Sequence, residues 1–144
     1  MGACGRTEAV TTAEFPSPSM ELTHILVVRD VERATAFYRD VLGGDLYRAY
    51  GDTSVVFRFL NTWLLLVTGG EPTDDKPTVT FAAPEDRDVV SSAVTIRVPD
   101  CHAAYEVLRT RGAEFLTPPV NWGHEVRCFF RDPDGHLFEL SQVG

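Results

Sequence analysis

The strongest candidate for chemistry in the sequence is a carboxylate that lies in an apolar strand. Glu139 follows the turn at 132–135, within the run HLFELSQV. A carboxylate that loses hydration among apolar neighbours is suited to act as a general base. Arg97 and Arg127 also fall in predicted strands, where a guanidinium can pair with Glu139 or bind an anionic ligand. The same pattern fits a buried carboxylate that merely accepts a hydrogen bond from a hydroxyl such as that of Thr23 or Thr95.

Histidine and aromatic side chains supply further candidates. His124 lies in a loop rich in proline and glycine that also carries Trp122. Such a loop can border a binding cleft, and an indole ring offers a flat surface to a ligand. Phe57 and Trp63 are aromatic candidates from predicted strands in the first half of the chain. His102 and His136 are expected at the surface.

The hydrophobic pattern of the first half predicts the elements that position these residues. The run at 22–28 is apolar and β-branched, which predicts a strand, and Asp30 follows as an N-cap. Apolar residues at helical spacing extend from Val31 to Leu42, and two glycines end that helix. Three further strands are predicted at 45–50, 54–60 and 63–68.

The second half repeats this order of elements. A strand at 93–98 precedes Asp100, which caps a helix that ends at Gly112, and strands follow at 113–117, 125–131 and 136–141. Asp30 and Asp100 differ by 70 positions, an offset that suits a duplicated module rather than a solenoid repeat. One such module leaves one face of its sheet bare. We therefore predict an α+β fold of two βαβββ modules whose curved mixed sheets form one cleft.

The composition of the chain suggests where its modules begin and end. Residues 1–19 lack periodicity and are expected to form a flexible extension, whereas 20–144 are expected to form one domain. Module one would span 20–68 and module two 92–144. The linker at 69–91 holds two adjacent glycines, three prolines and six acidic residues, and within it only 78–83 looks strand-like.

Two segments resemble a known family. They are LxVxD at 26–30, followed by FYxxVLG at 37–43, and DPDGHxFEL at 132–140. With the internal repeat, these motifs identify 20–144 as similar to the vicinal oxygen chelate superfamily. That superfamily includes glyoxalase I, extradiol dioxygenases, and fosfomycin and bleomycin resistance proteins. The resemblance implies the fold predicted above and a homodimer, but no single activity.

The resemblance also implies four positions for metal ligands, one in the first strand and one in the last strand of each module. In this chain these positions hold Thr23, Leu66, Ala93 and Glu139. His24 lies one residue out of register and is expected on the opposite face of its strand, unless a bulge turns it inward. The metal site is therefore incomplete, and no cofactor is expected. If a divalent metal binds, we expect Glu139 and His24 to hold it, with His124 or His136 as an extra donor.

Charge, hydropathy and cysteine content limit the partners and the compartment. The chain has 144 residues with 13 basic and 21 acidic side chains, a net charge of −8, which argues against a nucleic-acid partner. No apolar run approaches the roughly 20 residues of a membrane span. The three cysteines, Cys4, Cys101 and Cys128, form no CxxC pair, and no secretory signal is expected. These features favour the cytoplasm.

We therefore expect a protein that binds a small molecule. It would either sequester a small aromatic or polar ligand, as resistance proteins do, or act as a metal-free enzyme with Glu139 as the base. The alternative is a metal-dependent lyase, isomerase or dioxygenase similar to glyoxalase I, so whether the chain is an enzyme stays open. The candidate ligand-binding residues are Thr23, Phe57, Trp63, Leu66, Ala93, Arg97, Trp122, His124 and Arg127.

Overall fold

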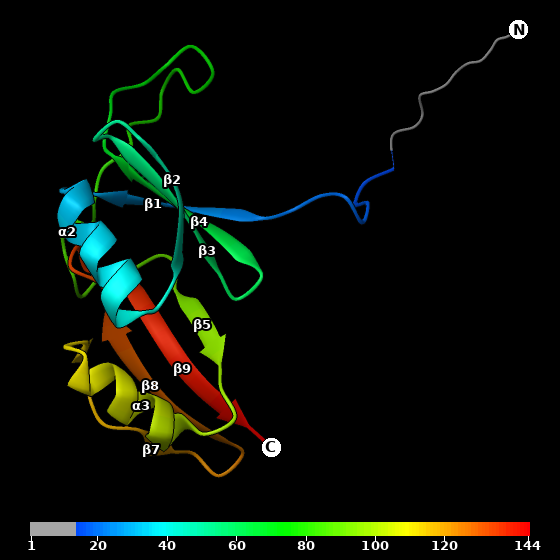
Figure 1. The fold of residues 1–144 in the computed structure, drawn as a ribbon, viewed down its shortest axis with the longest axis vertical. Coiled ribbons are helices and arrows are strands. Elements are labelled where there is room, and N and C mark those ends of the chain that lie inside the picture. The colour runs from blue at the N-terminus through cyan, green and yellow to red at the C-terminus, as the bar shows by residue number, and fades with distance from the viewer. Residues whose placement is uncertain (1–13) are drawn as a thin grey trace, which may run out of the picture.

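The computed structural model describes residues 14–144. Cys4 and most of the predicted N-terminal extension therefore lie outside the described residues. Residues 14–22 precede the first strand and extend away from the body of the molecule (Figure 1). No helix in the described part of the chain is long and apolar enough to cross a membrane.

Module one contains a four-stranded sheet, sheet one, and a helical segment. Its elements are β1 (Thr23–Val28), α2 (Val31–Ala36), the π-helix η1 (Phe37–Val41), β2 (Asp45–Tyr50), β3 (Ser54–Phe59) and β4 (Thr62–Thr68). The strand order is β1-β4-β3-β2, with β1 parallel to β4. The carboxylate of Asp30 accepts hydrogen bonds from the backbone N–H groups of Glu32 and Arg33, so the predicted N-cap is confirmed. The helix predicted to end at Leu42 changes from α to π geometry after Ala36.

Module two repeats this topology in sheet two. Its elements are β5 (Val94–Arg97), α3 (Cys101–Thr110), β6 (Glu114–Phe115), β7 (Val120–Asn121), β8 (Glu125–Arg131) and β9 (Leu137–Val143). The strand order is β5-β9-β8-β6, with β5 parallel to β9, and β7 pairs with β8 as an addition that the sequence did not predict. Asp100 caps α3 as predicted, by accepting from the N–H of Ala103. Two βαβββ modules are therefore present.

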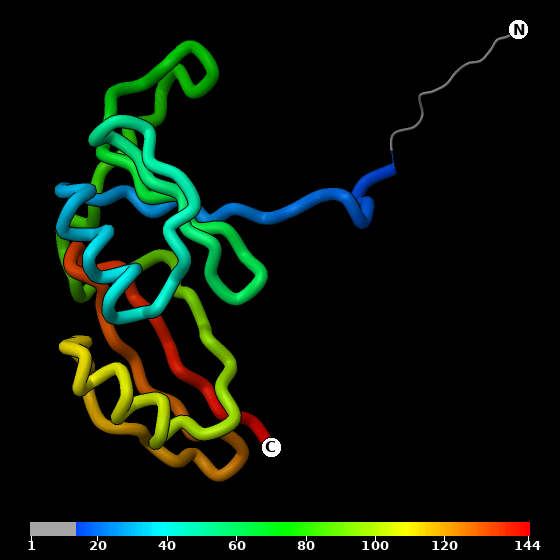
Figure 2. Tube along the Cα trace, viewed as in Figure 1, coloured from blue at the N-terminus to red at the C-terminus, as the bar shows by residue number. Residues whose placement is uncertain are grey.

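The segment that joins the modules is mostly irregular. It leaves β4 at the far end of module one, loops out, and returns to enter β5 (Figure 2). The prediction of a strand at 78–83 is wrong, since the pairing in this region is an isolated bridge between Gly70 and Phe81. Pro77 and Pro84 flank that stretch, and proline cannot donate to a β-ladder.

The two helices lie on the same side of the molecule (Figure 1), and one hydrophobic core runs beneath both. In β1, Leu26 and Val28 are buried in that core, while Ile25 on the other face is 44% exposed. We call the face of each sheet that turns away from its helix the open face. Because α2 and α3 share one side, the two open faces lie on the other.

The turn between β8 and β9 forms hydrogen bonds that hold module two against module one. Its carboxylates are almost fully buried, Asp132 at 1% and Asp134 at 2% exposure. Asp132 accepts a 2.7 Å hydrogen bond from the Tyr38 hydroxyl, and Asp134 accepts a 3.0 Å bond from the backbone N–H of Arg29. Burial raises the pKa of Asp132, and burial together with Asp132 raises the pKa of Tyr38 well above its ordinary value.

His136, at the end of this turn, is less exposed than predicted. It is half-buried rather than solvent-facing, because its Nε2 lies 2.7 Å from the backbone carbonyl oxygen of Val27 in module one. The two described cysteines are buried, with the Sγ atoms of Cys101 and Cys128 3.8 Å apart. Burial raises the pKa of the Cys128 thiol to about 12, which suits a packing role rather than a reactive one.

We predict that Tyr38→Phe lowers the free energy of unfolding by about 1–3 kcal/mol, because it leaves a buried oxygen of Asp132 without its donor. Urea denaturation measures the change, and Tyr50→Phe, at a half-exposed tyrosine, is the matched control.

The raised pKa of Tyr38 contributes stability that is present below the ordinary tyrosine pKa of about 10 and is lost as pH rises above it. The variant should therefore lose less stability than the parent in that alkaline range. Equal stability of parent and Tyr38→Phe at pH 7 would contradict the assigned role of this bond.

Candidate functional site

The open face of sheet one carries a hollow of about 290 Å³. It is lined by Glu21, Thr23, Tyr47, Tyr50, Val56, Trp63 and Leu65. Trp63 is fixed in this surface, because its indole N–H donates to the Glu21 carboxylate at 2.6 Å and the Arg58 guanidinium lies 4.4 Å from the ring centroid. Tyr47 packs edge-on against the same ring at 5.0 Å. The hollow is therefore a mainly aromatic and aliphatic surface.

The open face of sheet two carries polar groups instead, with Glu139 near its centre. Register pairs Glu139 with Thr95 on the parallel neighbour β5, and the Thr95 hydroxyl donates to the carboxylate at 2.6 Å. Nε of Arg127 lies 4.0 Å from the other carboxylate oxygen. The Glu139 side chain is 13% exposed, so most of it is sheltered, with a hydrogen bond from Thr95 on one oxygen and the positive charge of Arg127 near the other. Thr95 is one of the two hydroxyl partners considered for this carboxylate, and the structure selects it.

A second carboxylate, which the sequence analysis missed, pairs with the same arginine. Glu125 on β8 accepts a hydrogen bond from the Ser141 hydroxyl and lies 3.4 Å from Nη1 of Arg127. Arg97 donates to the same serine oxygen at 2.9 Å. The Ser141 hydroxyl, aided by Arg127 and Arg97, holds the pKa of Glu125 below its usual value. The period of two along β8, which puts Glu125 and Arg127 on one face, is the signal that could have revealed it.

Arg127 also contacts two aromatic rings. Its guanidinium carbon lies 5.3 Å from the Trp122 ring centroid and 5.9 Å from that of Phe129. Trp122 is 56% exposed, so one side of this stack is open to a ligand. We call Trp122, Glu125, Arg127, Phe129 and Glu139 the open-face cluster. His124 is exposed in the loop next to it, and Ala93 is exposed just before β5.

Two residues predicted to line the cleft do not reach it. Leu66 and Phe57 are both 0% exposed and pack in the core on the helix side of sheet one. Leu66 is paired with Leu26 of β1, so the alternation that buries Leu26 buries Leu66 as well. The open-face position of β4 is held by Leu65, one residue earlier. Thr23 and Trp63, by contrast, do lie in the hollow of sheet one.

The residues at the metal-ligand positions do not fit a divalent cation. The four positions on the open faces hold Thr23, Leu65, Ala93 and Glu139, which together offer one carboxylate. Zinc and similar metals need three or four nitrogen, oxygen or sulfur donors. His24 shares its face of β1 with the buried Leu26 rather than with Thr23. Across residues 14–144, no group of three His, Cys, Asp or Glu side chains could hold a metal.

Comparison with known proteins agrees with this architecture. The family model described as Glyoxalase/Bleomycin resistance protein/Dioxygenase superfamily matches residues 21–140. A lactoylglutathione lyase of Haemophilus influenzae is 27% identical over 127 residues, which cover 85% of this chain and 93% of that protein.

Solved structures are similar in fold at low sequence identity. A glyoxalase/bleomycin resistance protein/dioxygenase from Nocardioides superimposes with a TM-score of 0.70 at 24% identity, covering 88% of this chain and 85% of the other. TnmS3, an antibiotic binding protein from Streptomyces sp. CB03234, does so with a TM-score of 0.62 at 23% identity, covering 88% and 97%.

We predict that Ser141→Ala moves the pKa of Glu125 upward, because the serine hydroxyl is the main group that stabilises the ionised carboxylate. NMR titration of the glutamate side-chain carbons measures this pKa. Ser54→Ala, in sheet one, is the control and should leave the titration of Glu125 unchanged. An unchanged or lower pKa in Ser141→Ala would show that another group sets the ionisation of Glu125.

Proposed function

Because the chain belongs to the glyoxalase/bleomycin resistance protein/dioxygenase superfamily, we propose that it binds and sequesters a planar aromatic small molecule without a metal. The observation that carries this proposal is the open-face cluster, in which one arginine lies near two aromatic rings and two carboxylates. The similarity to an antibiotic binding protein supports a binding role, although the identity is 23%.

The open-face cluster favours a flat ligand that bears a positive charge or hydrogen-bond donors. The exposed side of Trp122 offers a ring face, and aromatic stacking contributes about 0.5–1.5 kcal/mol beyond the area that it buries. Glu125 and Glu139 can accept hydrogen bonds from groups at the edge of such a ligand. Arg97 and Arg127 balance the carboxylates, so the ligand need not carry a full charge.

We propose that the site is completed in a homodimer. Each open face is half of a cleft, since sheet one offers the hollow around Trp63 and sheet two offers the open-face cluster. Tyr47 at 59%, Tyr50 at 50% and Ile25 at 44% exposure leave apolar area on sheet one that a second copy would cover. The free thiols of Cys101 and Cys128 are consistent with the cytoplasm as the compartment.

A metal-free enzyme is the second candidate. Glu139 supports it, because a carboxylate fixed by Thr95 and Arg127 beside an aromatic surface is placed to accept a proton from a bound substrate. The metal-dependent alternative has the lactoylglutathione lyase relative in its favour, but its four ligand positions offer one carboxylate.

We predict that proflavine, a planar aromatic cation, binds the protein saturably and raises its Tm. Trp122→Ala should weaken this binding at least tenfold, about 1.4 kcal/mol, because it removes one ring of the stack. Quenching of tryptophan fluorescence and isothermal titration calorimetry both measure the affinity. Phe15→Ala, at an exposed aromatic residue outside both sheets, is the control and should bind as the parent does. Equal affinity of parent and Trp122→Ala would refute the proposed site.

We predict that Glu139→Gln separates the candidate functions. A binding protein shows no turnover in either form and still binds its ligand in this variant, since glutamine can accept hydrogen bonds from Thr95 and from the ligand, but the loss of one carboxylate should weaken the binding of a cation. An enzyme with Glu139 as the base loses turnover while it keeps binding, as product analysis by mass spectrometry would show. Elemental analysis of protein purified without chelators tests the remaining alternative, and one metal ion per chain would overturn the metal-free proposal.

A further inference from the structure

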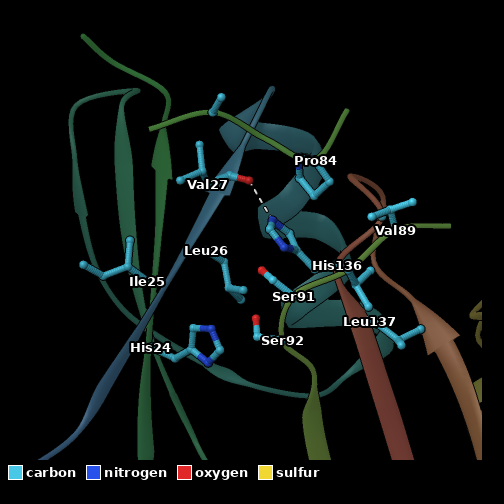
Figure 3. A pocket seen from close by; sticks show the side chains of 13 residues that line it. His24, Ile25, Leu26, Val27, Pro84, Val89, Ser91, Ser92, His136 and Leu137 are labelled. Atoms are coloured by element: carbon cyan, nitrogen blue, oxygen red, sulfur yellow. Dashed lines mark hydrogen bonds between the residues drawn. The ribbon is translucent and has the colours of Figure 1, made fainter. Parts of the chain in front are cut away.

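A cavity of about 280 Å³ lies between the two modules, apart from the open-face cluster (Figure 3). Three segments border it, namely β1 at 24–27, the inter-module segment near 82–84 and 89–92, and the end of the β8–β9 turn with the first residue of β9 at 135–137. We call it the seam cavity. At roughly 30 Å³ per water molecule, it has room for a ligand of several non-hydrogen atoms.

Polar side chains from all three segments meet at the seam cavity. The hydroxyls of Ser91 and Ser92 and the imidazole of His24 point toward its interior (Figure 3). The fourth polar side chain, His136, is held by the hydrogen bond between its Nε2 and the Val27 carbonyl oxygen. A carbonyl oxygen can only accept, so Nε2 carries the hydrogen and the ring orientation is fixed.

The edge of β1 adds backbone donors. β1 pairs with β4 on one side alone, and the His136 bond places the Val27 carbonyl on its unpaired side. The N–H and C=O of one strand residue point the same way, and every second residue repeats the direction. The N–H groups of Ile25 and Val27 therefore point from the free edge of β1 toward the seam cavity.

The lining of the seam cavity contains no Asp, Glu, Lys or Arg side chain. This contrasts with a chain whose net charge is −8. The Arg29 guanidinium stands just behind one wall, where it donates to the carbonyl oxygen of Pro84 and pairs with Asp134. No carboxylate lines the seam cavity itself, so its donors suit a ligand group that accepts hydrogen bonds. Val89, Val90 and Leu137 supply apolar walls.

We propose that the seam cavity is a second ligand site, which binds a small acid through its oxyanion. The hydroxyls of Ser91 and Ser92, the His24 imidazole and the free N–H groups of β1 would hold the oxyanion, and the valines and Leu137 would contact a short apolar body. Such a ligand touches both modules and the segment between them. The site is separate from the open-face cluster, so its occupancy does not depend on the function proposed above.

Two-dimensional ¹H–¹⁵N NMR of the full chain tests the proposal, with inorganic phosphate, butyrate and butylamine as probes at constant ionic strength. Butylamine has a body like that of butyrate but the opposite charge, so it is the matched control. We expect saturable shifts of the Val27, Ser91 and Ser92 amides with phosphate or with butyrate and none with butylamine. The probe that binds more tightly tells whether a phosphate or a carboxylate group is preferred. Equal shifts with butylamine, or no saturable shift with either anion, would overturn the proposal.

Variants test whether the named side chains hold the anion. Ser91→Ala with Ser92→Ala should weaken binding of the better anion at least tenfold, and His24→Ala should also weaken it. His102→Ala removes an exposed imidazole from α3 and should leave the affinity unchanged. Ser91 and Ser92 are exposed loop residues, so circular dichroism should show that their double variant is folded. Unchanged affinity in both the serine and the His24 variants would assign the anion to another place.

Discussion

The burial of two aspartates in the turn between β8 and β9 is the constraint on which the rest of the structure depends. Asp132 and Asp134 leave water almost completely, which is costly unless each carboxylate finds donors. Asp132 finds them in its own turn and in the Tyr38 hydroxyl, and Oδ1 of Asp134 finds them in Arg29 and Arg33, whereas the buried Oδ2 of Asp134 has no partner among the described residues. The buried carboxylates of module two therefore require hydrogen-bond donors from module one. This requirement fixes how the two halves of the duplicated chain sit against each other.

The packing of module two against module one determines where the two open faces lie. With the turn seated against the junction of β1 and α2, both helices share one side and one core. The open faces lie on the other side, and their side chains differ in chemistry despite the common topology of the two sheets. Sheet one presents Trp63 and Tyr47 in a mainly apolar hollow, whereas sheet two presents charged groups from β8 and β9. The cleft proposed to form from these unlike halves would suit a ligand with an apolar face and a polar edge.

Local patterns predicted much of this architecture. The repeat, both N-caps and the strand bounds Asp45–Tyr50 and Glu125–Arg131 follow from side-chain periodicity and turn chemistry, which act over a few residues. Register between strands does not follow from such patterns. The run of three leucines in β4 is compatible with either choice of which residues face the core. Its pairing with β1 places Leu65 on the open face and Leu66 in the core. The contact of His136 with Val27 joins residues 109 positions apart, a separation beyond the reach of any local pattern.

Glu139 occupies one of the four metal-ligand positions, although the other three do not supply enough ligands to bind a metal. An ionised carboxylate in a sheltered site requires a positive charge or hydrogen-bond donors, and a bound cation is one way to supply them. Here Thr95 supplies the hydrogen bond and Arg127 the charge, so Glu139 is stabilised by the chain itself. Arg127 is at the same time stacked near Trp122. The proposed ligand, entering between them, would have to replace the contacts of Arg127 with better ones, so its affinity would depend on an exchange of partners rather than on a vacant charge. Such an exchange favours ligands that resemble a guanidinium in being flat and rich in hydrogen-bond donors.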